Sequence, residues 1–392
     1  KAILWPHPEQ CPSPLPKCYP IRIRISITCE VSMNIERRLE RVTLKGEILT
    51  PIHIGDGTDL EPLDYVIDES LYRINLGSFL SSLNPAVQQK FKSFTQKGML
   101  GRVQLVQIRR FIKENFSSHS PYLWKAEVSP TVKQLYIEKF EEPENQLLIS
   151  PFIRSADRPI IPGSSLKGVI RTALLNHWSK EIERPKVPGK YKEVEAEMLK
   201  ALDPPRRDGD RYKFNIDKEI MRALRIEDIM LPDDGTQFGK VSNFGIKEGV
   251  LHETNIQMIR EVSISTLSHG GSCPVEVAIS IDHRYIKHNG SLLGRRDLDI
   301  DTVLSSCDSF YRRVLQDERK RFFYGRSQDI ERIYDAIDEQ SQGAFLLRIG
   351  WGSGFDAMTI TKFRDQNIKW GKSKNLVEGK YPLGWIKIAP IS

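Results

Sequence analysis

Residues 160–171 place serine hydroxyls and two cations where a loop turns into a helix. A Pro-Gly pair in this stretch indicates a turn, and Ser164 or Ser165 can cap the helix start that follows. Lys167 and Arg171 lie four residues apart, on one side of the predicted helix. Because free N–H groups at a helix start attract anions, these cations favour a site for an anion such as a nucleic-acid phosphate. An ordinary capped helix with two solvated cations has the same pattern.

A second candidate segment is rich in glycine and follows a buried strand pattern at 344–349. Gly350, Gly352 and Gly354 alternate with larger residues, so the spacing differs from the G-x-G-x-x-G pattern of dinucleotide-binding proteins. No Walker P-loop pattern occurs in the serine-containing segment either. We interpret the glycines as positions where one backbone approaches another closely, with a tight structural turn as the alternative.

His53 lies in a glycine-rich turn after the first predicted strand. It could act as a general base, but the sequence shows no partner for it. Asp56 and Asp59 follow in the same turn, where solvated carboxylates are common. The histidines and the five cysteines have no metal-ligand spacing, so we predict no metal and no cofactor. The absence of a CxxC pair argues against a zinc knuckle, and a reduced, cytoplasmic compartment is the simplest fit to the cysteines.

The composition is that of a soluble folded protein, and the net charge favours a polyanionic partner. The chain has 392 residues, of which 39% are hydrophobic and 28% are charged, and its formal net charge is +7. No apolar run reaches the length of a membrane span, so we expect no membrane association.

Six long elements must position the candidate residues. In chain order they are a strand (42–50), a helix (165–181), two strands (222–231 and 274–282), helices (299–341) and a strand (344–349). This β-α-β-β-α-β order predicts an α+β fold with a ferredoxin-like or RNA-recognition-like core. A last short strand is expected near the end of the chain, and further strands are expected at 135–140 and 146–153.

The connections between these elements are too long for a compact domain and predict large insertions. Residues 1–32 are rich in proline and are expected to be an extension outside the core fold, whereas 33–392 form the body. We expect insertions at 56–159 (mainly helical, especially 76–118), 183–220 and 233–272 (hairpin-like). The core segments are then about 41–55, 160–182, 221–232, 273–283, 297–355 and 383–389.

Three segments together carry a resemblance to CRISPR-associated RAMP proteins. They are LTPIHIG (49–55), IPGSSLKG followed by Arg171 (161–171) and GWGSG (350–354). Three further segments narrow it to the family of the fifth Csm subunit of type III-A effector complexes: EPLDYVID (61–68), RIGWGSG (348–354) and PLGW (382–385). The match extends over residues 41–388, and the order and spacing of the segments are more specific than any one of them.

The resemblance implies a non-catalytic subunit in antiviral defence. Such subunits cap a filament of related Csm backbone subunits, contact the guide RNA (crRNA) toward its 3′ end, and support its maturation, by recruiting other nucleases of the host. On this basis we predict that phosphates are held by Ser164, Ser165, Lys167 and Arg171. Gly350, Gly352 and Gly354 would let the RNA come close, and Arg348 and His53 would be weaker contacts.

Two other functions stay open from the sequence. Some RAMP proteins process guide RNA without a metal, so His53 could serve a metal-independent endoribonuclease. A protein–protein adaptor would assemble with partner subunits and bind no RNA alone.

Overall fold

The computed structural model describes residues 39–95, 102–142, 147–181, 202–203, 213–214, 219–289, 298–363 and 371–391. All of them lie within the unit Arg37–Ser392. The predicted extension at 1–32 and most of the predicted insertion at 183–220 lie outside the described residues.

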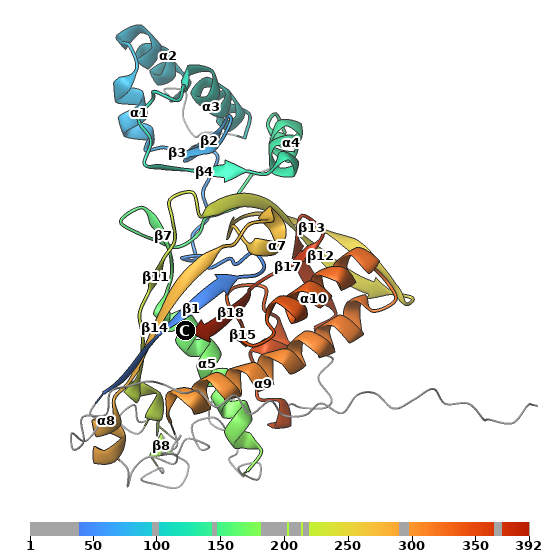
Figure 1. Ribbon diagram of the computed structural model, residues 1–392. Coiled ribbons are helices and arrows are strands. Elements are labelled where there is room, and N and C mark those ends of the chain that lie inside the picture. The colour runs from blue at the N-terminus through green and yellow to red at the C-terminus, as the bar shows by residue number, and fades with distance from the viewer. Residues whose placement is uncertain are drawn as a thin grey trace, which may run out of the picture. The chain divides into compact units, whose positions relative to one another are not determined.

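A five-stranded antiparallel sheet is the centre of the fold (Figure 1). Its order is β10 (Leu224–Ile226), β14 (Pro274–Ile281), β1 (Glu40–Ile48), β18 (Trp385–Pro390) and β15 (Phe345–Arg348). Helices α5 (Gly163–Ser179) and α9 (Ile300–Glu318) contact each other and share one apolar core with this sheet. The predicted apolar face of α5 is confirmed, because Leu166, Ile170 and Leu174 are all buried in that core.

The predicted order of elements is present, but the sheet differs in two places. The C-terminal strand β18 lies between β1 and β15, so β15 is at an edge. The single strand predicted at 222–231 is wrong: it is divided into η2 (Ile220–Ala223), β10 and β11 (Ile229–Met230). β11 leaves the central sheet and pairs with β7 (Arg158–Ile161), which in turn pairs with β6 (Arg154–Ser155). The mixture of helices and antiparallel strands is nevertheless an α+β fold.

A second sheet is built around a long hairpin, which was expected within 233–272. The hairpin consists of β12 (Thr236–Lys247) and β13 (Val250–Ser263). The sheet order is β17 (Tyr381–Pro382), β16 (Ser373–Val377), β12, β4 (Trp124–Val128), β3 (Leu71–Arg73) and β2 (Tyr65–Ile67), and β5 (Ile149–Ser150) pairs with β13. Strands from distant parts of the sequence therefore pair with this hairpin, β16 and β4 with β12, and β5 with β13.

The helices expected at 76–118 are present as α1 (Leu76–Ser82), α2 (Pro85–Thr95) and α3 (Arg102–Asn115), with an apolar cluster of their own. The strand predicted at 135–140 is wrong, because this stretch belongs to helix α4 (Pro130–Lys139). The Ser129 side chain accepts a hydrogen bond from the backbone N–H of Val132, and Val132 and Tyr136, four residues apart, are buried. Capping and helical periodicity thus outweigh the β-propensity of the apolar residues.

The remaining elements are short, apart from the longer helix α10. They are β8 (Leu202–Asp203), β9 (Lys213–Phe214), α7 (Thr266–His269), α8 (His283–His288), η3 (Arg319–Phe323), α10 (Gln328–Gln340), η4 (Phe355–Ala357) and η5 (Thr361–Phe363). Within the described ranges, no helix has both the length and the apolar character needed to cross a membrane.

Candidate nucleic-acid interface

A hollow of about 500 Å³ lies where five distant segments meet. The segments are the turn after β1, the strand β5, the first turn of α5, the last residues of β13 and the glycine-rich loop after β15. Its lining includes His53, Asp59, Ser165, Arg260, Gly350 and Trp351. Three of the predicted RNA-binding residues, Ser165, Gly350 and His53, are therefore brought together, and Asp59 lies beside them.

His53 is almost fully buried, and both of its ring nitrogens are engaged. Nδ1 lies 2.6 Å from the backbone carbonyl oxygen of Glu261, which can only accept, so Nδ1 carries the proton. Nε2 then accepts a hydrogen bond from Nη1 of Arg260 at 3.0 Å. Burial lowers the pKa of His53 to about 4, and the charge of Arg260 adds to this shift, so the ring is neutral at pH 7. His53 therefore orients Arg260 and has no nitrogen left for a ligand.

Arg260 is partly exposed, and its guanidinium lies over the ring of Trp351. The guanidinium carbon is 3.8 Å from the ring centroid, which is a close cation–π contact. Among the described residues, Arg260 has no carboxylate ion-pair partner, and its Nε is buried without a hydrogen-bond partner. Burial lowers the pKa of Arg260 and the charge of Asp59 opposes this, yet a guanidinium stays charged.

The end of β13 is fixed by a buried ionic frame. The carboxylate of Glu261 accepts two hydrogen bonds from Arg154, at 2.7 and 2.5 Å, and one from the hydroxyl of Thr236 at 2.6 Å. Arg154 in turn lies 3.7 Å over the ring of Trp124. Since the Glu261 side chain is fully buried and its hydrogen bonds are short, the backbone carbonyl that holds His53 is itself held in place.

The start of α5 differs from the prediction. The helix begins at Gly163, and no side chain of Ser164 or Ser165 caps it; instead the carboxylate of Asp228 accepts a hydrogen bond from the N–H of Gly163 at 2.7 Å. Gly163 is required because an added Cβ would lie 2.1 Å from the carbonyl oxygen of Ile226. Ser165 lines the hollow, whereas Ser164 is exposed outside its lining.

Lys167 and Arg171 are not part of the lining of the hollow. Nη2 of Arg171 lies 3.5 Å from the carboxylate of Glu219, whose side chain is only 9% exposed. Burial lowers the pKa of Lys167, and Glu219 acts against that shift. Their charges therefore face a buried carboxylate, whereas the sequence predicted that they hold a phosphate, with two solvated cations as the alternative.

Other parts of the chain pack closely against the three glycines of the loop after β15. Gly350 has φ +87°, and an added Cβ would lie 2.5 Å from the carbonyl oxygen of His53. A Cβ on Gly352 would lie 2.7 Å from a methyl carbon of Leu383, and one on Gly354 would lie 2.7 Å from a side-chain nitrogen. The close approach of two backbones is confirmed at Gly350, and protein atoms fill the space into which a Cβ would point at all three glycines. Gly350 nevertheless lines the hollow.

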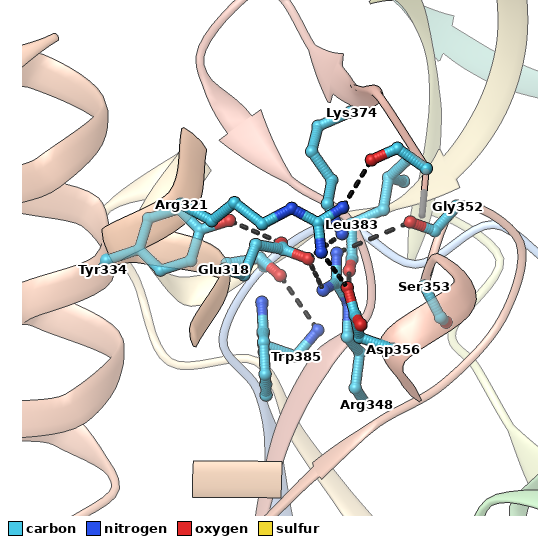
Figure 2. A network of polar contacts seen from close by, with 12 residues as sticks. Glu318, Arg321, Tyr334, Arg348, Gly352, Ser353, Asp356, Lys374, Leu383 and Trp385 are labelled. Atoms are coloured by element: carbon cyan, nitrogen blue, oxygen red, sulfur yellow. Dashed lines mark hydrogen bonds and ion pairs between the residues drawn. The ribbon is translucent and has the colours of Figure 1, made fainter. Parts of the chain in front are cut away.

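Arg348, predicted as a weak RNA contact, is 1% exposed and cannot reach a surface ligand. Its guanidinium donates to the carboxylate of Glu318 at 2.6 Å, and Lys374 and the hydroxyl of Tyr334 also contact that carboxylate (Figure 2). Burial raises the pKa of Glu318, but Arg348 and Lys374 lower it more, to about 2. Arg348 also donates to the carbonyl oxygens of Leu383 and Gly352, so it holds the glycine-rich loop from inside.

The sequence interpretation missed Arg260 and Trp351. Arg260 was hidden in a strand of the predicted hairpin insertion, where alternating charged residues are common. Trp351 lies between two glycines and could have been predicted as a contact residue, because a large aromatic side chain in a glycine-rich turn needs a packing partner. Among the described residues, no group of three or more histidines, cysteines or acidic residues could hold a metal ion.

Comparison with known protein families gives a match over most of the chain. The family model of the RAMP superfamily matches residues 45–355. The chain is 23% identical over 335 residues to the CRISPR system Cms protein Csm5 of Methanocaldococcus jannaschii, a match that covers 81% of this chain and 72% of that protein. It is 29% identical over 154 residues to Csm5 of Streptococcus thermophilus, which covers 36% and 40% of the two chains.

Solved structures share the fold. A chain in a cryo-EM structure of a Csm–crRNA–target RNA ternary complex of a type III-A CRISPR–Cas system has a TM-score of 0.61 at 20% identity and covers 89% of this chain and 100% of its own. The crystal structure of T. onnurineus Csm5 has a TM-score of 0.60 at 20% identity, covering 88% and 99%. The predicted resemblance to Csm5-type proteins is confirmed. Since the family model extends from β1 through the loop that lines the hollow, the chain belongs to the RAMP superfamily.

Proposed function

We propose that the chain is a non-catalytic, crRNA-binding subunit of a type III-A Csm complex. It would cap the filament of Csm backbone subunits near the crRNA 3′ end and support crRNA maturation in antiviral defence, with nucleases recruited from the host. The support is its similarity to Csm5 proteins and to a chain in a Csm–crRNA–target RNA complex. A cytoplasmic location fits the free Cys273 and Cys307.

The observation that carries the RNA-binding proposal is the hollow itself. It joins the first turn of α5 to the glycine-rich loop and contains a cation, Arg260, that has no carboxylate ion pair in the described part of the chain. Sequence-independent binding of nucleic acid rests on contacts to phosphates. The net charge of +7 is consistent with such a partner.

We further propose that β1, α5, β10, β14, α9 and β18 correspond to a ferredoxin-like core, with β15 added at one edge. The support is the antiparallel neighbour order β10-β14-β1-β18. In this assignment β18, and not the strand predicted at 344–349, is the fourth core strand.

Ser165 offers a test that leaves the fold intact. Ser165→Asp places a carboxylate in the first turn of α5, where the helix dipole stabilises negative charge, and also inside the hollow, where it repels phosphate. We expect unchanged thermal stability and RNA affinity about tenfold lower, measured by titration of labelled single-stranded RNA. Ser164→Asp is the matched control, because it adds the same charge outside the lining. Equal affinities for the two variants would contradict the site.

The endoribonuclease alternative requires a free nitrogen on His53, and the geometry counts against it. Nδ1–H is donated to a carbonyl oxygen and Nε2 accepts from Arg260. Incubation of the protein with labelled guide precursor in EDTA distinguishes the two functions: cleavage that His53→Ala abolishes would favour the enzyme. A chain that assembles with Csm subunits but binds no RNA alone would favour the adaptor.

A further inference from the structure

We propose that Arg260 and Asp59 form a two-part ribonucleotide site in the hollow, in which Arg260 binds a phosphate and Asp59 accepts a hydrogen bond from a ribose 2′-hydroxyl. This inference rests on the proposed RNA-binding function and adds to it the residues that bind and the means of distinguishing RNA from DNA. Both side chains line the hollow, and their charges act on each other through space.

The side chain of Arg260 is preorganised to bind an anion. One face of its guanidinium lies on Trp351, and Nη1 donates to His53, so the side chain is fixed without using up its charge. Nη2 contacts only the sulfur of Met258 at 3.7 Å, a weak acceptor, and Nε has no partner. Because Nε is buried, the donors that stay available to a ligand are N–H groups of Nη1 and Nη2, and their planar fork matches a phosphate.

Asp59 is the second part of the site. One carboxylate oxygen accepts a hydrogen bond from the hydroxyl of Ser150 at 2.5 Å, which orients the group. Among the described residues it has no cation within ion-pair distance, so its negative charge is not consumed by the protein. A carboxylate next to a phosphate site is unfavourable unless the ligand also supplies a donor. The ribose 2′-hydroxyl is such a donor, and DNA lacks it.

The surroundings have room for more than one nucleotide. A second hollow, of about 450 Å³, shares Asp59, Ser150 and Arg260 with the first and extends to Lys139 and Gln257. The shared residues therefore lie between two openings. A single strand that passes through both would meet Arg260 and Asp59 at its middle, as expected for a backbone-tracking groove.

The test is equilibrium binding of the full chain to a labelled single-stranded RNA and to a DNA of the same sequence. Arg260→Ala should weaken RNA binding about tenfold and reduce the slope of log affinity against log salt by about 0.7, the value for one phosphate contact on a single strand. Arg260→Lys keeps the charge but loses the planar fork, so its loss should be smaller. Asp59→Ala should lower the ratio of RNA to DNA affinity about fivefold or more.

Arg332→Ala and Asp329→Ala are the matched controls, because both side chains are exposed on α10 and pair only with each other among the described residues. Thermal unfolding of each variant checks the fold; if Arg260→Ala is unfolded, Arg260→Lys decides the question. Two results together would overturn this inference. The Arg260 variant would bind RNA with the affinity and salt slope of the controls, and Asp59→Ala would leave the ratio of RNA to DNA affinity unchanged. If Ser165→Asp still weakens RNA binding, only the assignment of Arg260 and Asp59 is wrong and the proposed function stands. If the wild-type chain binds no RNA, both proposals are wrong.

Discussion

Two arginines near the glycine-rich loop make the same kind of contact with an aromatic ring but differ in their burial and in their charged partners. Arg260 and Arg348 each lie over a tryptophan ring, at 3.8 and 4.8 Å from the ring centroid. Arg348 is buried and paired with Glu318, whereas Arg260 is partly exposed and has no carboxylate ion pair among the described residues. We call the surroundings of Arg348 the sealed cluster (Glu318, Tyr334, Arg348 and Lys374). We call the surroundings of Arg260 the open cluster (His53, Arg260 and Trp351).

The comparison shows how the surroundings of a cation determine its use. In the sealed cluster the charge is neutralised and its donors bind carbonyl oxygens of the loop, so it fixes structure. In the open cluster the cation is held by a neutral imidazole and an aromatic ring, which orient it and leave its charge for a ligand. The sealed cluster therefore fixes the glycine-rich loop, and Trp351 of that loop orients Arg260 in the open cluster.

The largest effect is expected from Glu318→Gln, which leaves Arg348 and Lys374 buried without a counter-charge. Removing one partner of a buried ionic cluster costs about 3–5 kcal/mol of unfolding free energy. Urea denaturation measures it. Glu339→Gln, on the exposed side of α10, is the control. Equal stability of the two variants would mean that the sealed cluster does not hold the fold.

Acid should weaken the sealed cluster in a defined range. Burial raises the pKa of Glu318, but Arg348 and Lys374 lower it to about 2, below its ordinary value of 4.5. A depressed carboxyl pKa stabilises the fold above the unfolded-state pKa, and this contribution is lost as the pH falls from about 4.5 to about 2. We expect a loss on the order of 3 kcal/mol in denaturation curves over that range. In Glu318→Gln the acid loss should be smaller by this amount; an identical acid loss would contradict the assignment.

Gly350→Ala tests the link between the two clusters. At φ +87° an alanine is strained, and its Cβ would meet the carbonyl oxygen of His53. We expect thermal stability to fall by about 2 kcal/mol. Gly168→Ala is the matched control: its added Cβ meets nothing within 4 Å, and alanine in a helix should raise stability by about 0.5–1 kcal/mol. The same loss in both variants would contradict the close approach at Gly350.

The smallest effect is expected from Arg260→Met. Methionine keeps much of the apolar contact with Trp351, and no buried carboxylate among the described residues loses its partner. Unfolding free energy should change by less than about 1 kcal/mol, whereas Arg348→Met should cost about 3 kcal/mol or more. Similar losses of unfolding free energy for Arg260→Met and Arg348→Met would contradict the distinction between the two clusters.

Local pattern predicted much of the fold. The 3.6-residue periodicity of Leu166, Ile170 and Leu174 predicted the buried face of α5, and alternation predicted β1 and β14. The insertion of β18 between β1 and β15 could not be predicted, because strand order depends on pairing between segments far apart in sequence.

The candidate site was predicted only in outline. Sequence position placed His53, Ser165 and Gly350 at turns, and the fold brings those turns together. The burial of Arg348 could not be inferred, because its partner Glu318 lies 30 residues away in a helix whose charged residues resemble a solvated face. Arg260 acquires its role only through contacts with His53 and Trp351, which local pattern does not contain.

The most direct test of RNA binding at the hollow is crosslinking of the unaltered chain to thiouridine-substituted single-stranded RNA, followed by peptide mapping. The account predicts crosslinks to peptides that contain Ser165, Arg260 or Trp351. Crosslinks confined to helices α1–α3, with none in those peptides, would contradict it.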